Sequence, residues 1–479
     1  MERAPTRCAD ATDGADGPRT AGAAHILRPL ETPDPGAPVP LAGQIKRLLL
    51  ITAQYGGIVL ATLVALDVAC IVLGVFPPTY HYGLPDVGWV ASPPTGAMHE
   101  DRCVDYTTGT TYTYTRNEDG VRTPYRGAEL LADSQSYLIG VTGDSQTDLC
   151  APNDETHAGV LEKTLNASGR RAVVLAYGAG RYSPLQDYLV FKKSLLKYRP
   201  HVFVLNLYTG NDFYDMLRVD DRPHFVRSGS GYAIAPPVWY LYDAPGVRRR
   251  SRVLFALRSL AKRTGVQGFI ERIQQLRAVA AEQGKGLATV AAYMNDLRKS
   301  SEPSLGYPAA FSAQMLNQQL FFHRFPESRA ESIRRVRALL QLIRQENPGM
   351  VLLLSPLPSY ELAQQQPVDS ALLRTIARLP ITYESGVQEE RALYDTLRVL
   401  ALETGWLFAD NLRPLQAYKG PDRLYNSFDY HLLPPASEII GREQAETLKA
   451  SLLPRPGHRT TRSGLQAIHH RCKAKARSA

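Results

Sequence analysis

The hydrophobic positions divide the chain into one long apolar run and a later series of short apolar segments. The run from Leu48 to Phe76 holds 29 residues and a single carboxylate, Asp67. At about 1.5 Å per residue it is long enough to cross a bilayer of about 30 Å. Residues 1–45 are rich in Ala, Gly, Pro, Thr and Asp and lack apolar periodicity, which predicts a disordered leader.

Basic residues stand at only one end of this run. Lys46 and Arg47 precede it directly, whereas residues 77–101 contain no Lys or Arg. The positive-inside rule therefore predicts a single-pass anchor over residues 46–76 of an inner or plasma membrane, with a cytoplasmic N-terminus and an extracytoplasmic remainder. A cleaved signal peptide is the alternative, and the lengths of the run and of the leader argue against it. The length also argues against a buried soluble helix.

Short apolar segments with β-branched or aromatic residues alternate with helix-like stretches after residue 136. This alternation predicts an α/β fold with a parallel sheet of about five strands buried on both faces. Helices are predicted over 155–167 and 184–198, the second opening with Ser183 as a cap and Pro184 in its first turn. The predicted strands are 137–142, 172–176, 202–207, 350–355 and 406–409.

The remaining segments surround this α/β pattern. Residues 77–135 form an extended lead-in to a domain that we expect over 136–452. Residues 213–345 break the alternation with a polar loop, a mostly helical stretch at 253–298 and a region rich in Pro and aromatic residues. We interpret 213–345 as an insertion that caps the site, and 453–479 as a basic disordered tail.

Charge and cysteines exclude several classes of protein. The formal net charge is +9, but the tail supplies seven positive charges without one acidic residue, so we expect no nucleic-acid partner. Five cysteines without a Cys-x-x-Cys pair argue against a metal site or a thioredoxin-like site. Cys103 and Cys150 lie in the segment predicted to be both folded and exported, and the sequence leaves open whether they form a disulfide.

Candidate chemistry follows four of the five predicted strands, where an open α/β sheet collects its reactive groups. The first strand ends in the turn GDSQT, which contains Ser145, and the second ends in AYGAG, which contains Gly180. The third is followed by TGND, with Asn211. After the fifth comes SFDYHLLPP, which places Asp429 and His431 before a helix that begins at the prolines. Each motif alone is a common turn; their order makes coincidence the weaker explanation.

Taken in this order, the serine, glycine, asparagine and histidine resemble the four motifs of the SGNH (GDSL) hydrolase superfamily, over about 136–448. The lead-in resembles that of membrane-anchored bacterial members. The resemblance implies a three-layer α/β fold, Ser145 as nucleophile, His431 as its base and Asp429 as the acid. It implies an oxyanion hole from the N–H groups of Ser145 and Gly180 and the amide of Asn211, with no cofactor and no metal. The chain departs from the family in its Asp-x-His spacing, because Phe428 occupies the usual position of the acid.

Three functions fit this pattern. The first is an extracytoplasmic serine esterase that acts on O-acyl esters, chiefly O-acetyl esters of an acylated carbohydrate, through an acyl-serine intermediate. The second is an O-acyltransferase of an exported or cell-envelope polysaccharide, whose partners would be the envelope-polysaccharide machinery. The third is a catalytically inactive SGNH-like domain that binds glycans or acts as a scaffold. The retained Ser145 and His431 favour the two enzymes over the third.

Overall fold

A computed structural model describes residues 41–72, 82–84, 86–90, 95–105, 109–218, 222–237, 318–319, 321–323, 325–364, 382–426, 430–449 and 451. The chain divides into two units, residues 1–66 and residues 67–479. Most of the predicted leader, the helical stretch at 253–298, Asp429 and the basic tail lie outside the described residues.

The apolar run forms one helix, α1 (Leu41–Val72). This helix begins at Leu41 rather than at residue 46, because the intervening residues include Leu, Ala, Gln and Ile, which sustain a helix. Its segment Leu48–Leu66 is long and apolar enough to cross a membrane. Large apolar side chains such as Leu48, Tyr55 and Leu60 are exposed along it.

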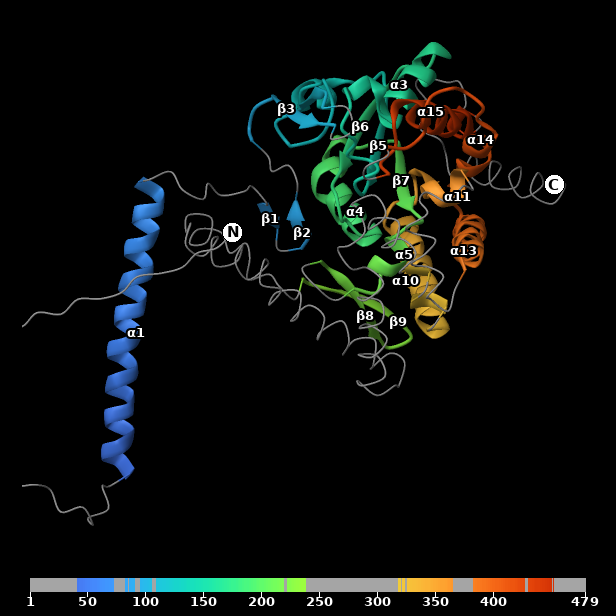
Figure 1. Ribbon diagram of the computed structural model, residues 1–479. Helices are drawn as coiled ribbons and strands as arrows, with labels where there is room; N and C mark the ends of the chain where they lie inside the picture. Colours follow the sequence, from blue (N-terminus) through green and yellow to red (C-terminus); the bar gives the residue numbers. More distant parts are fainter. Residues whose placement is uncertain are drawn as a thin grey trace, which may run out of the picture. The chain divides into compact units, whose positions relative to one another are not determined.

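The second unit contains a parallel sheet of five strands in the order β11-β10-β7-β5-β6 (Figure 1). The predicted α/β fold and its parallel sheet are therefore confirmed. In chain order the arrangement is 2-1-3-4-5, so the winding reverses beside β5, between β6 and β7. Ligands of such sheets bind at the carboxyl ends of the strands beside this reversal. The strands are β5 (Tyr137–Gly143), β6 (Ala172–Gly178), β7 (Val202–Tyr208), β10 (Val351–Leu357) and β11 (Leu407–Phe408).

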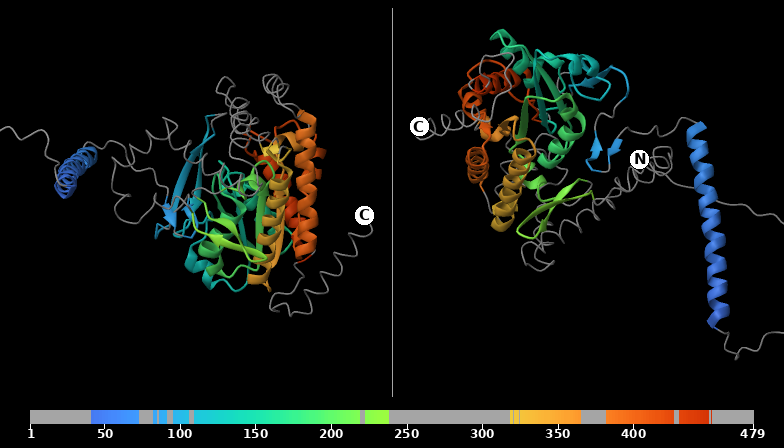
Figure 2. Two further views of the ribbon diagram at one scale, coloured as in Figure 1. Left: turned by 90° about the horizontal axis from the view of Figure 1, so that it is seen from below. Right: turned by 180° about the vertical axis from the view of Figure 1, so that it is seen from behind.

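Alternate side chains of each strand enter two different cores, as the period of two in a strand requires. Phe203 and Leu205 of β7 belong to the core beneath α4 (Pro184–Val190), α10 (Pro326–Glu346) and α13 (Tyr383–Thr404). Val202 and Val204 belong to the opposite core, beneath α3 (His157–Ala167) and α15 (Pro434–Lys449). Figure 2 shows α10 and α13 side by side. The fold thus has three layers, helix, sheet and helix.

The two helices predicted between the first strands are present, with changes at their ends. The first, α3, begins at His157 instead of residue 155, because the side chain of Thr156 caps it by accepting from Gly159 N–H. Ser183 caps α4 and Pro184 opens it, as predicted. The second predicted helix is α-helical only to Val190, and continues as a π-helical turn (Phe191–Leu195) and a 3₁₀ turn (Leu196–Tyr198).

Before the sheet, the lead-in forms two small antiparallel hairpins and a short helix. The hairpins pair β1 (Tyr82–Leu84) with β2 (Gly88–Val90) and β3 (His99–Val104) with β4 (Thr111–Arg116). The helix is α2 (Gly127–Ala132). Within the predicted insertion, α5 (Asp212–Asp215) is followed by a third hairpin, β8 (His224–Ser228) with β9 (Gly231–Ala235). Two further helices, α11 (Tyr360–Gln364) and α14 (Leu412–Ala417), lie beyond β10.

Candidate active site

The turn after β5 holds Ser145 at the carboxyl edge of the sheet. Asp144 is buried, and its carboxylate accepts a hydrogen bond from Gln146 N–H at 2.9 Å while its carbonyl accepts from Thr147 N–H at 3.0 Å. A Cβ on Gly143 would lie 2.2 Å from Thr147 Oγ1, so the tightness of the turn requires glycine there. Ser145 is itself partly exposed. The turn is rigid and leaves its serine accessible.

Gly180 lies directly against this serine. A Cβ built on Gly180 would be 3.6 Å from Cβ of Ser145, an ordinary van der Waals contact. The residue after it, Arg181, has φ of 68°, which is in the left-handed region. A non-glycine residue there is strained and occurs where surrounding contacts hold it. One such contact is the hydrogen bond that Arg222 Nη1 donates to the carbonyl of Arg181, at 3.2 Å.

Asn211 occupies the end of β7 and precedes α5. Its Nδ2 donates to Asp215 Oδ2 at 2.7 Å, and Asp215 pairs with Arg222 at 2.9 Å. Because Arg222 also binds the carbonyl of Arg181, these side chains connect Asn211 to the peptide that follows Gly180. Asp215 and Arg222 are both buried. The two strand ends that carry the predicted oxyanion donors are therefore joined by one polar network.

His431 is connected to the serine turn through Gln146. The side-chain amide of Gln146 donates to the carbonyl of Tyr430 at 3.2 Å and accepts from Leu432 N–H at 3.0 Å, so it binds the backbone on both sides of His431. Tyr430 has φ of 55°. The backbone on both sides of His431 is thus bonded to the residue that follows Ser145.

Buried carboxyl groups surround the serine turn. Burial raises the pKa of Asp144 to about 7, while the Gln146 hydrogen bond and the charge of His431 lower it. Burial also raises the pKa of Asp187 and of Asp212 well above the ordinary value, and the charge of Asp144 adds to both shifts. Burial around these three side chains therefore favours neutral acids over carboxylates.

Asp187 gives a prediction about stability. Neither of its carboxyl oxygens has a hydrogen-bond partner among the described residues. The folded protein keeps this proton to a higher pH than the unfolded chain, whose aspartates titrate near 3.8, so ionisation favours unfolding as the pH rises above that value. We expect Asp187→Asn, which cannot ionise, to be more stable than the parent, by a margin that grows by at most about 1.4 kcal/mol per pH unit.

Urea unfolding of the parent and of Asp187→Asn at pH 5 and pH 8 measures this margin. Asp154→Asn is the control, because Asp154 is exposed and paired with Lys163. A margin for Asp187→Asn that stays constant or shrinks from pH 5 to pH 8 contradicts the prediction.

The structure brings Ser145, Gly180, Asn211 and the backbone of His431 to one edge of the sheet, and their catalytic roles remain predictions. Asp429 lies outside the described residues, so its predicted role remains a prediction. Sequence reasoning missed Gln146, Asp215 and Arg222. Gln146 belongs to the GDSQT motif and could have been suspected there, whereas Arg222 gave no signal. Among the described residues, no group of three or more His, Cys, Asp and Glu side chains is placed to hold a metal ion.

No family model and no curated protein sequence matches this chain. Among solved structures, it is similar to a lipase/acylhydrolase from Enterococcus faecalis, with 12% identity, 66% of this chain and 98% of that chain covered, and a TM-score of 0.31. It is also similar to an acetylxylan esterase from Geobacillus stearothermophilus, with 12% identity, 66% of this chain and 94% of that chain covered, and a TM-score of 0.30. A third similar structure is a protein named as a GDSL-like lipase from Parabacteroides merdae, with 10% identity, 66% of this chain and 96% of that chain covered, and a TM-score of 0.31.

The third of these matches bears the name of the GDSL group that the motifs of this chain resemble. With TM-scores near 0.3, these matches say nothing about activity or substrate. We therefore infer function from the residues of the site.

Proposed function

We propose that this protein is a serine esterase of the SGNH type. The observation that carries the proposal is the pairing of the Gln146 side chain with the backbone on both sides of His431. A serine hydroxyl is a weak nucleophile until a neighbouring base takes its proton, and this pairing holds the backbone of a histidine at the serine turn. Gly180 stands where an added Cβ would lie 3.6 Å from Cβ of Ser145, and Asn211, after β7, completes the group.

The reaction follows from these positions. His431 takes the proton of the Ser145 hydroxyl as its oxygen attacks the ester carbonyl. The resulting oxyanion accepts hydrogen bonds from the N–H groups of Ser145 and Gly180 and from the amide of Asn211. When the tetrahedral intermediate collapses, the alcohol leaves with the proton from His431, and an acyl-serine remains. Water, deprotonated by His431, then releases the acid and restores the serine.

Three properties of Asn211 and its neighbours support its role as a donor. Asn211 is partly exposed, and its amide oxygen is buried without a hydrogen-bond partner among the described residues. One amide hydrogen is used by Asp215, which fixes the orientation of the group and leaves the second hydrogen for an oxyanion. Arg222 holds Asp215 in turn, and no reorganisation of these groups is needed at the transition state.

The proposed location is extracytoplasmic, with α1 as an uncleaved anchor. Lys46 and Arg47 before the apolar run support a cytoplasmic N-terminus. A disulfide joins Cys103 to Cys150, the pair that the sequence left open, and such bonds persist in oxidising compartments. An O-acetyl ester of an envelope or exported carbohydrate is the substrate class that this location favours. Transfer to a sugar hydroxyl instead of water would use the same residues.

A serine-directed fluorophosphonate tests the proposal on the full chain in detergent. We expect labelling at Ser145, identified by peptide mass spectrometry, together with hydrolysis of p-nitrophenyl acetate. Ser168→Ala is the control and should be labelled like the parent, because Ser168 is exposed at the end of α3. If Ser145 stays unlabelled and the ester is not cleaved, the esterase proposal is wrong and the glycan-binding or scaffold function takes its place.

A further inference from the structure

The hairpin β3–β4 in the lead-in is attached to the edge of the sheet near the active site. Its two strands pair from His99 with Arg116 to Val104 with Thr111. The chain then returns along β6. There Arg122 N–H donates to the carbonyl of Ala176 at 2.8 Å, and the carbonyl of Arg122 accepts from Ala176 N–H at 3.2 Å. The reaction proposed above uses no residue of this hairpin.

One side of the hairpin holds the loop that follows Ser145. Cys103 of β3 forms the disulfide with Cys150, and Arg116 of β4 donates to Asp148 Oδ1 at 2.8 Å. Asp148 N–H in turn donates to the carbonyl of Asp144 at 3.2 Å. Arg116 also binds Asp101 at 2.8 Å. A covalent bond and an ion pair therefore connect the hairpin to the nucleophile turn.

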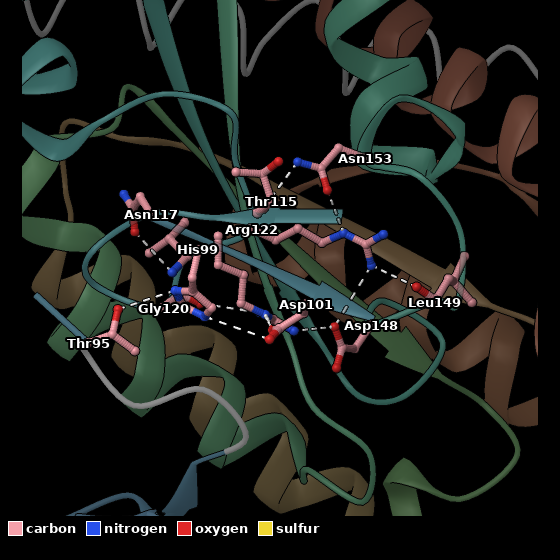
Figure 3. A network of polar contacts seen from close by, with 12 residues as sticks. Thr95, His99, Asp101, Thr115, Asn117, Gly120, Arg122, Asp148, Leu149 and Asn153 are labelled. Atoms are coloured by element: carbon pink, nitrogen blue, oxygen red, sulfur yellow. Dashed lines mark hydrogen bonds and ion pairs between the residues drawn. The ribbon is translucent and has the colours of Figure 1, made fainter. Parts of the chain in front are cut away.

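Arg122 holds the same loop from the sheet edge. Its guanidinium donates to the carbonyl of Leu149 at 2.7 Å, to the carbonyl of Ala151, and to Asn153 Oδ1 at 3.1 Å (Figure 3). The ring of Tyr114 lies 4.1 Å from the Arg122 guanidinium carbon, close enough for a cation–π contact. Burial lowers the pKa of Arg122 to about 10, so it remains charged at neutral pH. A buried arginine with these partners is fixed in place, and so is the loop that it binds.

The end of the hairpin reaches the other loop of the site. Asp105, the first residue after β3, accepts a hydrogen bond from Asn426 Nδ2 at 3.0 Å, and both side chains are buried. Asn426 N–H donates to the carbonyl of His431 at 2.8 Å, and its own carbonyl accepts from Tyr430 N–H at 3.1 Å. Asp105 is therefore bonded to the residue that holds the backbone of the base.

We propose that the hairpin β3–β4 is a positioning element that keeps the loops of Ser145 and His431 in register, with Asp105 as a positioning residue and the Cys103–Cys150 disulfide as its lock. The inference rests on the proposed function and goes further by assigning a role to the lead-in. Two reactive groups on separate loops must be held at a fixed distance from each other, since a shift of about 1 Å can cost about 100-fold in rate. Cys103 of β3 is bonded to the loop after Ser145, and Asp105, the residue after β3, is bonded to the loop of His431.

Reduction of the disulfide is then expected to lower activity. A dithiol reductant supplies two electrons and two protons, the Cys103 and Cys150 sulfurs become thiols, and the reductant leaves as its own disulfide. The loop after Ser145 keeps its contacts with Arg116 and Arg122 but loses the covalent one. The esterase would accordingly be most active in an oxidising compartment.

Kinetics of the full chain in detergent test the positioning role. We expect Asp105→Ala to lower kcat for p-nitrophenyl acetate by about 10-fold to 100-fold with little change in KM. Asp105→Asn, which keeps an acceptor oxygen for Asn426, should restore most of the activity. Thr113→Ala, an exposed change on β4, is the control. Equal kcat for Asp105→Ala and Thr113→Ala overturns the proposal, as does a loss that Asp105→Asn does not restore.

Hydrogen exchange separates this proposal from the proposed function, because it does not depend on catalysis. Asp105→Ala should speed exchange in peptides covering 424–432, and the double variant Cys103→Ser, Cys150→Ser should speed it in 143–151. Unchanged exchange in both overturns the inference even if Ser145 is an active nucleophile. Faster exchange in a protein without esterase activity would leave the hairpin as a loop support and refute only its catalytic part.

The reductant completes the test. Dithiothreitol should lower kcat of the parent toward that of the double cysteine variant and leave that variant unchanged. The comparison isolates this disulfide from the other three cysteines of the chain. Mass spectrometry shows whether Cys103 and Cys150 of the treated parent are free thiols. If they are free and the parent keeps full activity, the disulfide is not a lock.

Discussion

Ser145→Ala is expected to lower the turnover of ester substrates by about 10⁴-fold to 10⁶-fold, the loss typical of a missing nucleophile in a serine enzyme. His431→Ala should cost about as much, because nucleophile and base act as one unit and their losses do not add. The double variant Ser145→Ala, His431→Ala should therefore be no slower than either single variant. Thermal unfolding should show little change for Ser145→Ala, since Ser145 is partly exposed in its turn.

The measurement is kcat and KM for p-nitrophenyl acetate with the full chain in detergent. Ser168→Ala controls for the loss of a serine as such. Activity in Ser145→Ala within about 10-fold of the parent would show that another group performs the reaction, because no missing nucleophile costs so little. A double variant much slower than both single variants would contradict a shared step.

Asn211→Ala is expected to lower kcat by about 100-fold to 1,000-fold while KM changes little, because the amide is proposed to act on an oxyanion that exists only in the transition state. The substitution also removes the partner of Asp215, but Arg222 still pairs with that carboxylate at 2.9 Å. We therefore expect Asn211→Ala to fold and to bind substrate. The loss should be confined to the chemical step.

Asp215→Asn provides the contrast for this prediction. It keeps an acceptor oxygen for Asn211 and removes the charge that pairs with Arg222. A smaller loss of kcat than in Asn211→Ala is expected, since the donor remains and only its support is weakened. If Asn211→Ala instead raises KM and leaves kcat unchanged, the amide binds the ground state and is not an oxyanion donor.

The local elements could be predicted from the sequence because they depend on local patterns. All five predicted strands are present within about two residues of their predicted ends, since a strand buried on both faces is a continuous apolar segment wherever it stands in the sheet. Ser183 and Pro184 indicated the start of α4, because a capping serine followed by proline is a local signal as well. The motifs that end these strands placed Ser145, Gly180 and Asn211 at one edge.

The break of the second predicted helix at Val190 was not predictable in this way. The chain from Phe191 to Tyr198 keeps a helical apolar pattern but changes to π-helical and 3₁₀ turns. Phe191 packs on Phe203 of the sheet, with ring centroids 4.0 Å apart, and lies where a Cβ on Gly140 would be 2.9 Å from its ring. Such fitting against the sheet depends on residues distant in the chain, and periodicity carries no record of it.

The sequence by itself determined the apolar run, the strands and the order of the four motifs, and left open the disulfide between Cys103 and Cys150 that the structure shows. Only the tertiary structure decided the strand order, the bonds of Gln146 around His431, and the contact of Asp105 with Asn426. The two Gln146 bonds join residues 284 and 286 positions apart, and the bond between Asp105 and Asn426 joins residues 321 positions apart. Side-chain periodicity follows from neighbouring backbone geometry, whereas a hydrogen bond across the fold exists only once packing has brought two distant loops together.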